Sequence, residues 1–320
     1  MSWFSFHPGD FAVAFLSVLL EGIPFLLLGS LISGLVDAFV SPERLARILP
    51  RNPVAAVVMS GLLGLVFPMC ECGSVVVIRR FLRKGLPVGC AVTYMLGAPI
   101  VSPVVALSTF AAFRGQHPLE ITLLRLGIGF LIAVGVGLIF QKLPASAVLQ
   151  PGVGGPDIAP APSPSRGGLR IAPAPAEESV LPSSLGARLQ RALYSASTDF
   201  LDVAVFFIIG AAITSVLGTA VDRTALDPLA ANPALAIASL MLVAVALALC
   251  STTDAFIAAT SFPSFPMTAK LAFLVFGPMF DLKLYWLYGL LFKRRTILLL
   301  ALGLFMSIGL IAWRLNALGF

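Results

Sequence analysis

The chain is too apolar for a water-soluble protein. Of its 320 residues, 58% are hydrophobic and only 11% are charged, whereas soluble domains carry about 25% charged residues. The mean hydropathy is +0.99. A net charge of +6 is typical of a membrane protein whose Lys and Arg fill the cytoplasmic loops, so we expect no nucleic-acid partner. The composition predicts an all-α integral membrane protein in a lipid bilayer.

Long apolar runs divide the chain into membrane segments. Several reach about 20 residues, the length that crosses a hydrocarbon core of about 30 Å. The segment Met1–Asp10 contains no Lys or Arg, so we predict no cleavable signal peptide and expect the first run to stay in the mature protein. The runs are Phe11–Val40, Val54–Pro68, Leu86–Phe113, Ile121–Phe140, Phe200–Leu217, Ala234–Cys250, Leu271–Phe292 and Thr296–Trp313.

A stretch rich in Pro and Gly separates two apolar halves. Nine of the 24 prolines and five of the 28 glycines lie between Pro144 and Pro182. Such a composition cannot bury a core, so we expect these residues to be disordered or extended. We predict a first membrane repeat over residues 1–143, a cytoplasmic linker over 144–187 and a second membrane repeat over 188–320.

The two halves repeat the same landmarks at a nearly constant spacing. The segment from Glu21 to Gly29 aligns with the segment from Asp202 to Gly210 at a shift of 181 residues. Four further landmarks follow in the same order, at shifts of 180 or 179. An ordered series of this kind indicates duplication, which is common among transporters. The further pairs are Asn52 with Asn232, Cys70 with Cys250, Pro87 with Pro266 and Pro99 with Pro278.

Basic residues on both flanks of a short apolar run predict a re-entrant hairpin. The run Val54–Pro68 has 15 residues, which is about 22 Å of helix, and it ends at the polar turn Met69–Ser74. Arginines up to Arg51 precede it and the basic segment Arg79–Lys84 follows it. The positive-inside rule places both flanks in the cytoplasm, which a hairpin permits and a single span does not. Each half then crosses three times, and the second half is inverted relative to the first.

Each half also contains an interrupted span. The interruptions are predicted at Ala98–Pro103 and at Gly277–Pro278, because proline removes a backbone donor. Unpaired backbone inside a membrane is tolerated where it lines a protein or water cavity. Two hairpin tips and two broken helices at repeat-related positions therefore predict one central site.

The first predicted hairpin tip suits a soft cation. Thiolates bind Cu(I), Zn(II) and thiophilic metalloids, and Cys70 and Cys72 flank the carboxylate of Glu71. Repeat symmetry brings Cys250 toward the same axis as a third sulfur. We therefore predict that these four residues bind substrate, with the three cysteines as its metal or metalloid ligands. In the alternative interpretation the cysteines are small, buried hydrophobic residues, which is the interpretation we prefer for Cys90.

The second predicted tip carries hydroxyls and a carboxylate. We predict that Thr252 and Thr253 bind substrate and that Asp254 and Asp281 couple transport to an ion, because ionisable groups inside spans cost about 2.5–3.5 kcal/mol and mark function. Alternatively, Asp254 only caps the second arm of its hairpin. Lys283 should point away from Asp281, since residues two apart on a helix do not face each other.

Three segments resemble a known family. They are Phe67–Gly73 (FPMCECG), Arg79–Gly85 (RRFLRKG) and Leu96–Pro103 (LGAPIVSP). Over both halves, the chain resembles the broad bacterial predicted-permease family that includes the organoarsenical efflux permeases. The resemblance implies about eight annotated transmembrane segments and export across the cytoplasmic membrane. Members of this family are linked to efflux of trivalent organoarsenicals or of copper and zinc.

We therefore expect a secondary permease for a small inorganic or organometalloid substrate, with no cofactor and no enzymatic activity. The sequence contains no nucleotide-binding motif, so the energy should come from an ion gradient or from a partner subunit; a homo-oligomer is also open. Two alternatives remain. One is a membrane thiol–disulfide electron carrier that uses Cys70 and Cys250. The other is a non-transporting scaffold subunit of a membrane complex.

The basic flanks generate a topology prediction. Single cysteines placed at Arg83, in the linker or at Lys293 should be blocked only by membrane-permeant thiol reagents, because these sites face the cytoplasm. Labelling of intact cells with permeant and impermeant maleimides measures this, and a cysteine at Arg114, on the predicted outer side, is the positive control. Labelling at Arg83 by the impermeant reagent would overturn the hairpin.

Overall fold

The described part of the chain is almost entirely helical. The computed structural model describes residues 8–39, 49–50, 52–67, 69–153, 185–220 and 224–319, and within these ranges it contains helices and no β-strand. The predicted all-α membrane fold is confirmed. Five helical stretches in the described ranges are long and apolar enough to cross a membrane. They are Gly9–Phe39, Pro118–Gln141, Leu185–Gly218, Met267–Tyr288 and Arg294–Ala317.

The helices follow the same order in both halves. The first half contains α1 (Pro8–Phe39), α3 (Pro53–Val66), α4 (Glu71–Arg83), α5 (Val88–Gly97), α6 (Pro103–Ala112) and α7 (Pro118–Gln141). The second contains α9 (Leu185–Ala220), α10 (Pro233–Leu247), α11 (Thr253–Ser261), α12 (Met267–Met279), α13 (Leu282–Tyr288) and α14 (Arg294–Ala317). Outside this correspondence lie α8 (Ala145–Val148) and a 3₁₀ helix, Thr224–Ala231.

Equivalent caps begin equivalent helices. The side-chain oxygen of Asn52 accepts a hydrogen bond of 3.0 Å from the backbone N–H of Val54. Asn232 accepts one of 3.0 Å from the backbone N–H of Ala234. Each asparagine is followed by a proline at the first helical position, where a missing N–H leaves no hydrogen bond unmade. The Asn-Pro pairs that align in the sequence therefore start α3 and α10.

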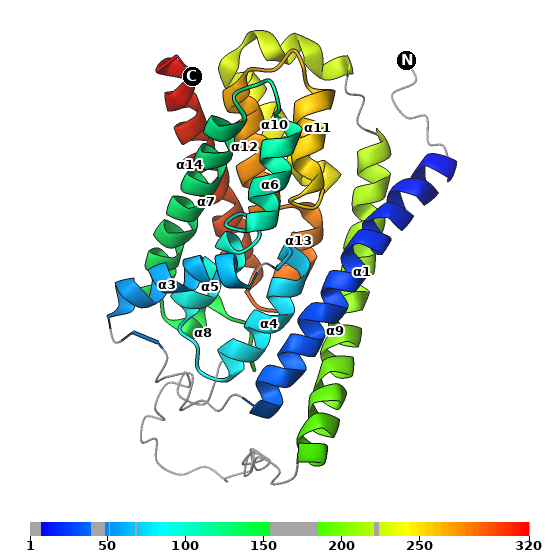
Figure 1. Cartoon of the computed structure of the whole chain (residues 1–320), viewed down its shortest axis with the longest axis vertical. Coiled ribbons are helices and arrows are strands. Elements are labelled where there is room, and N and C mark those ends of the chain that lie inside the picture. Colours follow the sequence, from blue (N-terminus) through cyan, green and yellow to red (C-terminus); the bar gives the residue numbers. More distant parts are fainter. Residues whose placement is uncertain are drawn as a thin grey trace, which may run out of the picture.

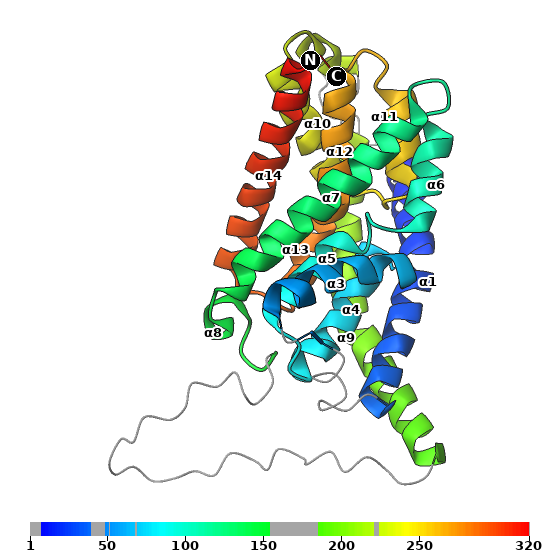
Figure 2. The same ribbon diagram turned by 60° about the vertical axis from the view of Figure 1, so that its left-hand side comes forward.

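The paired helices of the two halves run in opposite directions. In Figure 1, α1 descends from the upper end of the molecule while α9, packed beside it, ascends from the lower end. Figure 2 shows the same opposition between α7 and α14. The hairpin of α3 and α4 lies in the lower half of both views, and the hairpin of α10 and α11 lies in the upper half. "Upper" and "lower" refer below to the ends of the molecule in Figure 1.

Two repeat-related glycines let the α1–α9 pair approach the rest of the protein. A Cβ added at Gly29 of α1 would lie 2.9 Å from the Cα of Gly73, at the start of α4. A Cβ added at Gly210 of α9 would lie 3.0 Å from the Cα of Lys283, at the start of α13. Each helix of the pair therefore contacts the beginning of a short helix through a glycine, and these starts carry the candidate site.

Both predicted interruptions of the spans exist, but one is displaced. α5 ends at Gly97 and α6 begins at Pro103, as predicted. In the second half α12 continues through Pro278, so the predicted break at Gly277–Pro278 is wrong and the chain leaves the helix at Phe280. A proline in the last turn removes one donor without preventing the next residues from closing the helix. The backbone N–H of Phe280 still bonds the Phe276 carbonyl at 2.9 Å.

The start of the predicted linker packs against the second repeat. After α8, an antiparallel bridge joins Leu149 to Phe292, and Val148, Leu149 and Val153 are buried. The expectation that the segment buries no core is therefore wrong for this part, because its few apolar side chains find a surface on the second repeat. Residues 154–184 of the predicted linker lie outside the described residues.

The glycine contacts generate a stability prediction. Gly29→Ala should lower the free energy of unfolding by about 1–3 kcal/mol, the usual cost of overpacking, because its Cβ meets the backbone of Gly73. The matched control is Gly135→Ala, on α7, where an added Cβ meets nothing within 4 Å and alanine favours the helix. Thermal unfolding in detergent measures both. Equal melting temperatures for the two variants would show that the α1–α4 contact is not tight.

Candidate functional site

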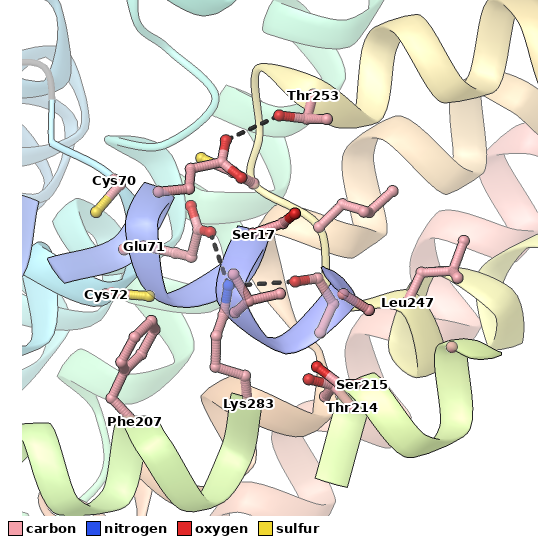
Figure 3. Close-up of a pocket in the computed structure, with 18 of the residues that line it drawn as sticks. Ser17, Cys70, Glu71, Cys72, Phe207, Thr214, Ser215, Leu247, Thr253 and Lys283 are labelled. Carbon is pink, nitrogen blue, oxygen red and sulfur yellow. Dashed lines mark hydrogen bonds and ion pairs between the residues drawn. The ribbon is translucent and has the colours of Figure 1, made fainter. Parts of the chain in front are cut away.

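A cavity of about 450 Å³ lies between the α1–α9 pair and the rest of the protein. Its walls come from α1, α9, α13, the start of α4 and the turn between α10 and α11, so both repeats contribute (Figure 3). The residues of α1 and α9 that line it belong to the upper parts of those helices. The polar and ionisable lining residues are Ser17, Glu21, Cys70, Glu71, Cys72, Thr214, Ser215, Cys250, Thr253 and Lys283.

The turn before α4 presents the sulfur atoms of the first hairpin tip. Cys70 is the N-cap of α4, and its Sγ accepts a hydrogen bond of 3.3 Å from the backbone N–H of Gly73. α1 passes close to this turn, since a Cβ at Gly73 would lie 3.0 Å from the backbone oxygen of Phe25. Cys72 is buried and Cys70 is half-buried. Both thiols and Glu71 therefore belong to one wall of the cavity (Figure 3).

Lys283 reaches from α13 to the first hairpin tip. Its Nζ lies 3.2 Å from Oε1 of Glu71, 3.3 Å from the Ala248 carbonyl oxygen and 3.7 Å from Oδ2 of Asp281. The expectation that Lys283 points away from Asp281 is wrong. Asp281 is the N-cap of α13 and has an extended backbone, so the rule for two residues within one helix does not apply to this pair.

One cation serves two buried carboxylates in this cluster. Oε2 of Glu71 and Oδ2 of Asp281 have no hydrogen-bond partner among the described residues. The other oxygen of Asp281 accepts a hydrogen bond of 2.6 Å from the backbone N–H of Leu284. Buried carboxylate oxygens without partners are costly. Two carboxylate oxygens of the cluster are therefore left without a hydrogen-bond donor among the described residues.

The second hairpin tip divides its side chains between the cavity and the interior. Cys250 and Thr253 line the cavity, and the hydroxyl of Thr253 donates a hydrogen bond of 2.8 Å to Oε1 of Glu21 on α1 (Figure 3). Thr252, whose Oγ1 lies 3.8 Å from Sγ of Cys250, is not among the lining residues. Of the residues predicted at this tip, Cys250 and Thr253 share the cavity with the thiols of the first tip.

Asp254 is paired with a cation that sequence analysis did not assign to it. Nη2 of Arg125 lies 3.0 and 2.8 Å from the two carboxylate oxygens of Asp254 and 2.9 Å from the Ser251 carbonyl. Nη1 of Arg125 donates a hydrogen bond of 2.7 Å to Thr109. Both charged side chains are fully buried. The available signal was an arginine within the apolar run Ile121–Phe140, but nothing in the sequence named its partner.

The two hairpin tips use the same electrostatic arrangement. In each, an acidic residue in the first turn of the second arm, Glu71 or Asp254, pairs with a buried cation from the other repeat. A helix N-terminus favours a negative side chain at that position. Glu71 and Lys283 line the cavity, whereas Asp254 and Arg125 do not. The first pair therefore borders the cavity, and the second joins α7 to α11 in the interior.

The cysteines predicted as metal ligands line one cavity without forming a closed metal centre. The described residues include no group of three or more His, Cys, Asp or Glu side chains placed to hold a metal ion. Cys70, Cys72, Cys90 and Cys250 are all free, and Cys90 is buried on α5 rather than at the cavity. Among the described residues, the cavity therefore presents sulfur atoms without a preformed coordination sphere.

Comparison with known proteins gives consistent matches over nearly the whole chain. A family model described as "Predicted permease" (ArsP_1) matches residues 9–316. The UPF0718 protein YcgR of Bacillus subtilis (strain 168) is 34% identical over 287 residues, which cover 89% of this chain and 90% of the relative. A putative two-component membrane permease complex subunit of Streptococcus mutans serotype c is 28% identical over 292 residues, 89% of this chain and 87% of the relative. No solved structure gives a significant match.

The Arg125–Asp254 pair generates a second stability prediction. Asp254→Asn leaves the Arg125 guanidinium buried and uncompensated, so it should lower the free energy of unfolding by about 3–5 kcal/mol. The double variant Arg125→Met/Asp254→Leu removes both charges and should recover most of that loss. Thermal unfolding in detergent measures each variant. If Asp254→Asn is as stable as the parent protein, the ion pair does not tie the repeats together.

Proposed function

We propose a transport function for this chain, which belongs to the predicted-permease family. Under this proposal it is a secondary permease of the bacterial inner membrane, and it exports a thiophilic metal or metalloid species. The chain is a multi-pass membrane protein. One observation carries the proposed substrate: Cys70, Cys72 and Cys250 line a single cavity together with Glu71 and Lys283.

The chemistry of the cavity favours a soft, cationic or neutral species. Thiols select soft metals and metalloids over hard cations. The carboxylates of Glu21 and Glu71 line the cavity against the single ammonium of Lys283, so ionised walls carry a net negative charge. Because Coulomb interactions strengthen away from bulk water, an anion is repelled there. The proposed substrate class therefore excludes oxyanions such as phosphate and arsenate.

Asp281 and Asp254 remain the proposed ion-coupling residues, in different situations. Asp281 contacts Lys283, and Lys283 also contacts Glu71 at the cavity. Substrate bound beside Glu71 would therefore change the electrostatic environment of Asp281 through Lys283. Asp254 is held by Arg125, and its pair has to open before it can exchange an ion. Under this proposal Asp281 is the primary coupling residue, and the energy source is an ion gradient.

The proposed architecture is an inverted repeat whose lower end faces the cytoplasm. The opposite directions of α1 and α9, and of α7 and α14, support it (Figures 1 and 2). The charge distribution supports the orientation, since the helix ends at the lower end carry Arg83, Lys142, Arg188 and Lys293. The positive-inside rule assigns such an end to the cytoplasm.

A partner subunit is a second proposal, favoured by one relative. The Streptococcus mutans protein is described as a subunit of a two-component permease complex, so a second membrane subunit could complete the transporter.

The thiol–disulfide carrier requires a reversible bond between Cys70 and Cys250, both of which are free thiols here. Capture of that disulfide in cells would favour the carrier over the permease.

The cysteines that line the cavity, Cys70, Cys72 and Cys250, form what we call the thiol wall, and they generate a transport prediction. Cys70→Ser and Cys72→Ser should each reduce transport of a soft cation at least about tenfold, a loss of about 1.4 kcal/mol, because serine keeps the size of cysteine but not its soft sulfur. Cys90→Ser is the matched control and should transport normally. Uptake of Cu(I), Zn(II) and trivalent arsenicals into vesicles containing the purified protein measures this. Full activity in the Cys70→Ser/Cys72→Ser double variant would show that these two thiols do not bind the substrate.

A further inference from the structure

Charged side chains tie α4 to the lower parts of α1 and α9. Arg80 of α4 lies 3.3 Å from Asp37 of α1, Nη1 to Oδ1, and 2.7 Å from Asp199 of α9, Nη2 to Oδ2. The hydroxyl of Ser33 donates a hydrogen bond of 2.6 Å to Asp199, and that of Ser195 donates one of 2.9 Å to Asp37. We call these five residues the lower network.

The lower network is largely shielded from water. The side chains of Arg80 and Asp37 are each 13% exposed and that of Asp199 is 5% exposed. Ion pairs at this depth are screened less than surface pairs, which contribute little. Arg80 is the member of α4 that contacts both α1 and α9, so its loss removes the ion pairs that it makes with each of them. The network therefore holds three helices together below the cavity.

The four network residues on α1 and α9 have informative counterparts in the other repeat. The shift of 181 residues that aligns Glu21 with Asp202 relates each of them to a residue that lines the cavity. The pairs are Ser33 with Thr214, Asp37 with Gly218, Ser195 with Ala14 and Asp199 with Val18.

Repeat-related positions are thus ion-paired at the lower end of the molecule and line the cavity at the upper end. At the lower end, Asp37 and Asp199 are joined by Arg80. Their counterparts, Gly218 and Val18, carry no charge and stand at the wall of a cavity. In an inverted repeat these positions lie at opposite faces of the membrane. At the lower end ion pairs join the helices, and at the upper end the corresponding positions line the cavity.

We infer that the lower network is a gate, and that the state described here is open to the upper face and closed to the lower one. The inference rests on the proposed permease function and specifies how its cavity is controlled. Substrate from the lower side reaches the thiol wall only after Arg80 leaves Asp37 and Asp199. Re-forming the network closes the lower path again, so the cavity faces one side of the membrane at a time.

The glycine contacts set the level at which the gate opens. Along α1, Gly29 lies between Phe25, which lines the cavity, and Ser33, which belongs to the lower network. There α1 contacts the start of α4 at Gly73. A pivot of α4 at this contact separates Arg80 from the α1–α9 pair while the turn that carries Cys70 stays in place.

Thiol accessibility tests the gate without any substrate. The reporter is a protein that keeps Cys70 and carries serine at Cys72, Cys90 and Cys250. A small charged methanethiosulfonate reagent is added to right-side-out and to inside-out vesicles. With the network intact, Cys70 should react from the upper face only. In Arg80→Gln, labelling from the lower face should rise about tenfold, as expected if the closed state loses about 1.4 kcal/mol.

Two further variants complete the test. Asp199→Asn weakens the network from α9 and should give the same increase in labelling from the lower face. It takes the place of Arg80→Gln if that variant does not fold. The matched control is Arg79→Gln, which removes the neighbouring arginine of α4 and its 3.0 Å pair with Asp202, a carboxylate with a 48% exposed side chain; it should label like the parent. Unchanged labelling in both network variants, or equal labelling of the parent from both faces, would refute the gate. Because no transport is measured, a failed substrate assignment leaves this result intact.

Discussion

A carboxylate buried inside a membrane needs a partner, and in this protein the partner of each hairpin tip comes from the other half of the chain. Glu71 is paired with Lys283 of α13, and Asp254 is paired with Arg125 of α7. Removing one member leaves a buried charge uncompensated, which costs about 3–5 kcal/mol in other proteins. The buried charge of each tip is therefore compensated by a residue of the other half.

The difference between the two cations separates scaffold from site. The guanidinium of Arg125 is planar and permanently charged, and it contacts both carboxylate oxygens, a carbonyl and a hydroxyl at once. The ammonium of Lys283 is a compact charge on a flexible stem, and Lys283 lines the cavity together with three cysteines. A rigid tie on one side of the bundle and an adjustable one on the other would let one half move against the other.

Local patterns in the sequence predicted the framework, and tertiary contacts account for what it missed. Asn-Pro pairs and the prolines at Ala98–Pro103 predicted where α3 and α10 begin and where α5 gives way to α6, because these features depend on neighbouring residues. The partner of Asp254 could not be found, since Arg125 lies 129 residues away and many acidic residues would satisfy an arginine. The error at Lys283 came from an assumed helix that in fact begins after Asp281.

The length of α1 connects the protein to the lipid around it. The helix has 32 residues, about 48 Å at 1.5 Å per residue, whereas the hydrocarbon core is about 30 Å thick. Few of its residues are buried, so the faces of α1 that do not pack against α9 and α4 contact lipid, and the helix lies slanted across the bundle (Figure 1). A helix that is too long for its bilayer tilts, and the tilt of α1 sets its distance from α4. Because α1 also lines the cavity, thicker or thinner membranes should shift the conformational equilibrium of this permease through the tilt of one cavity wall.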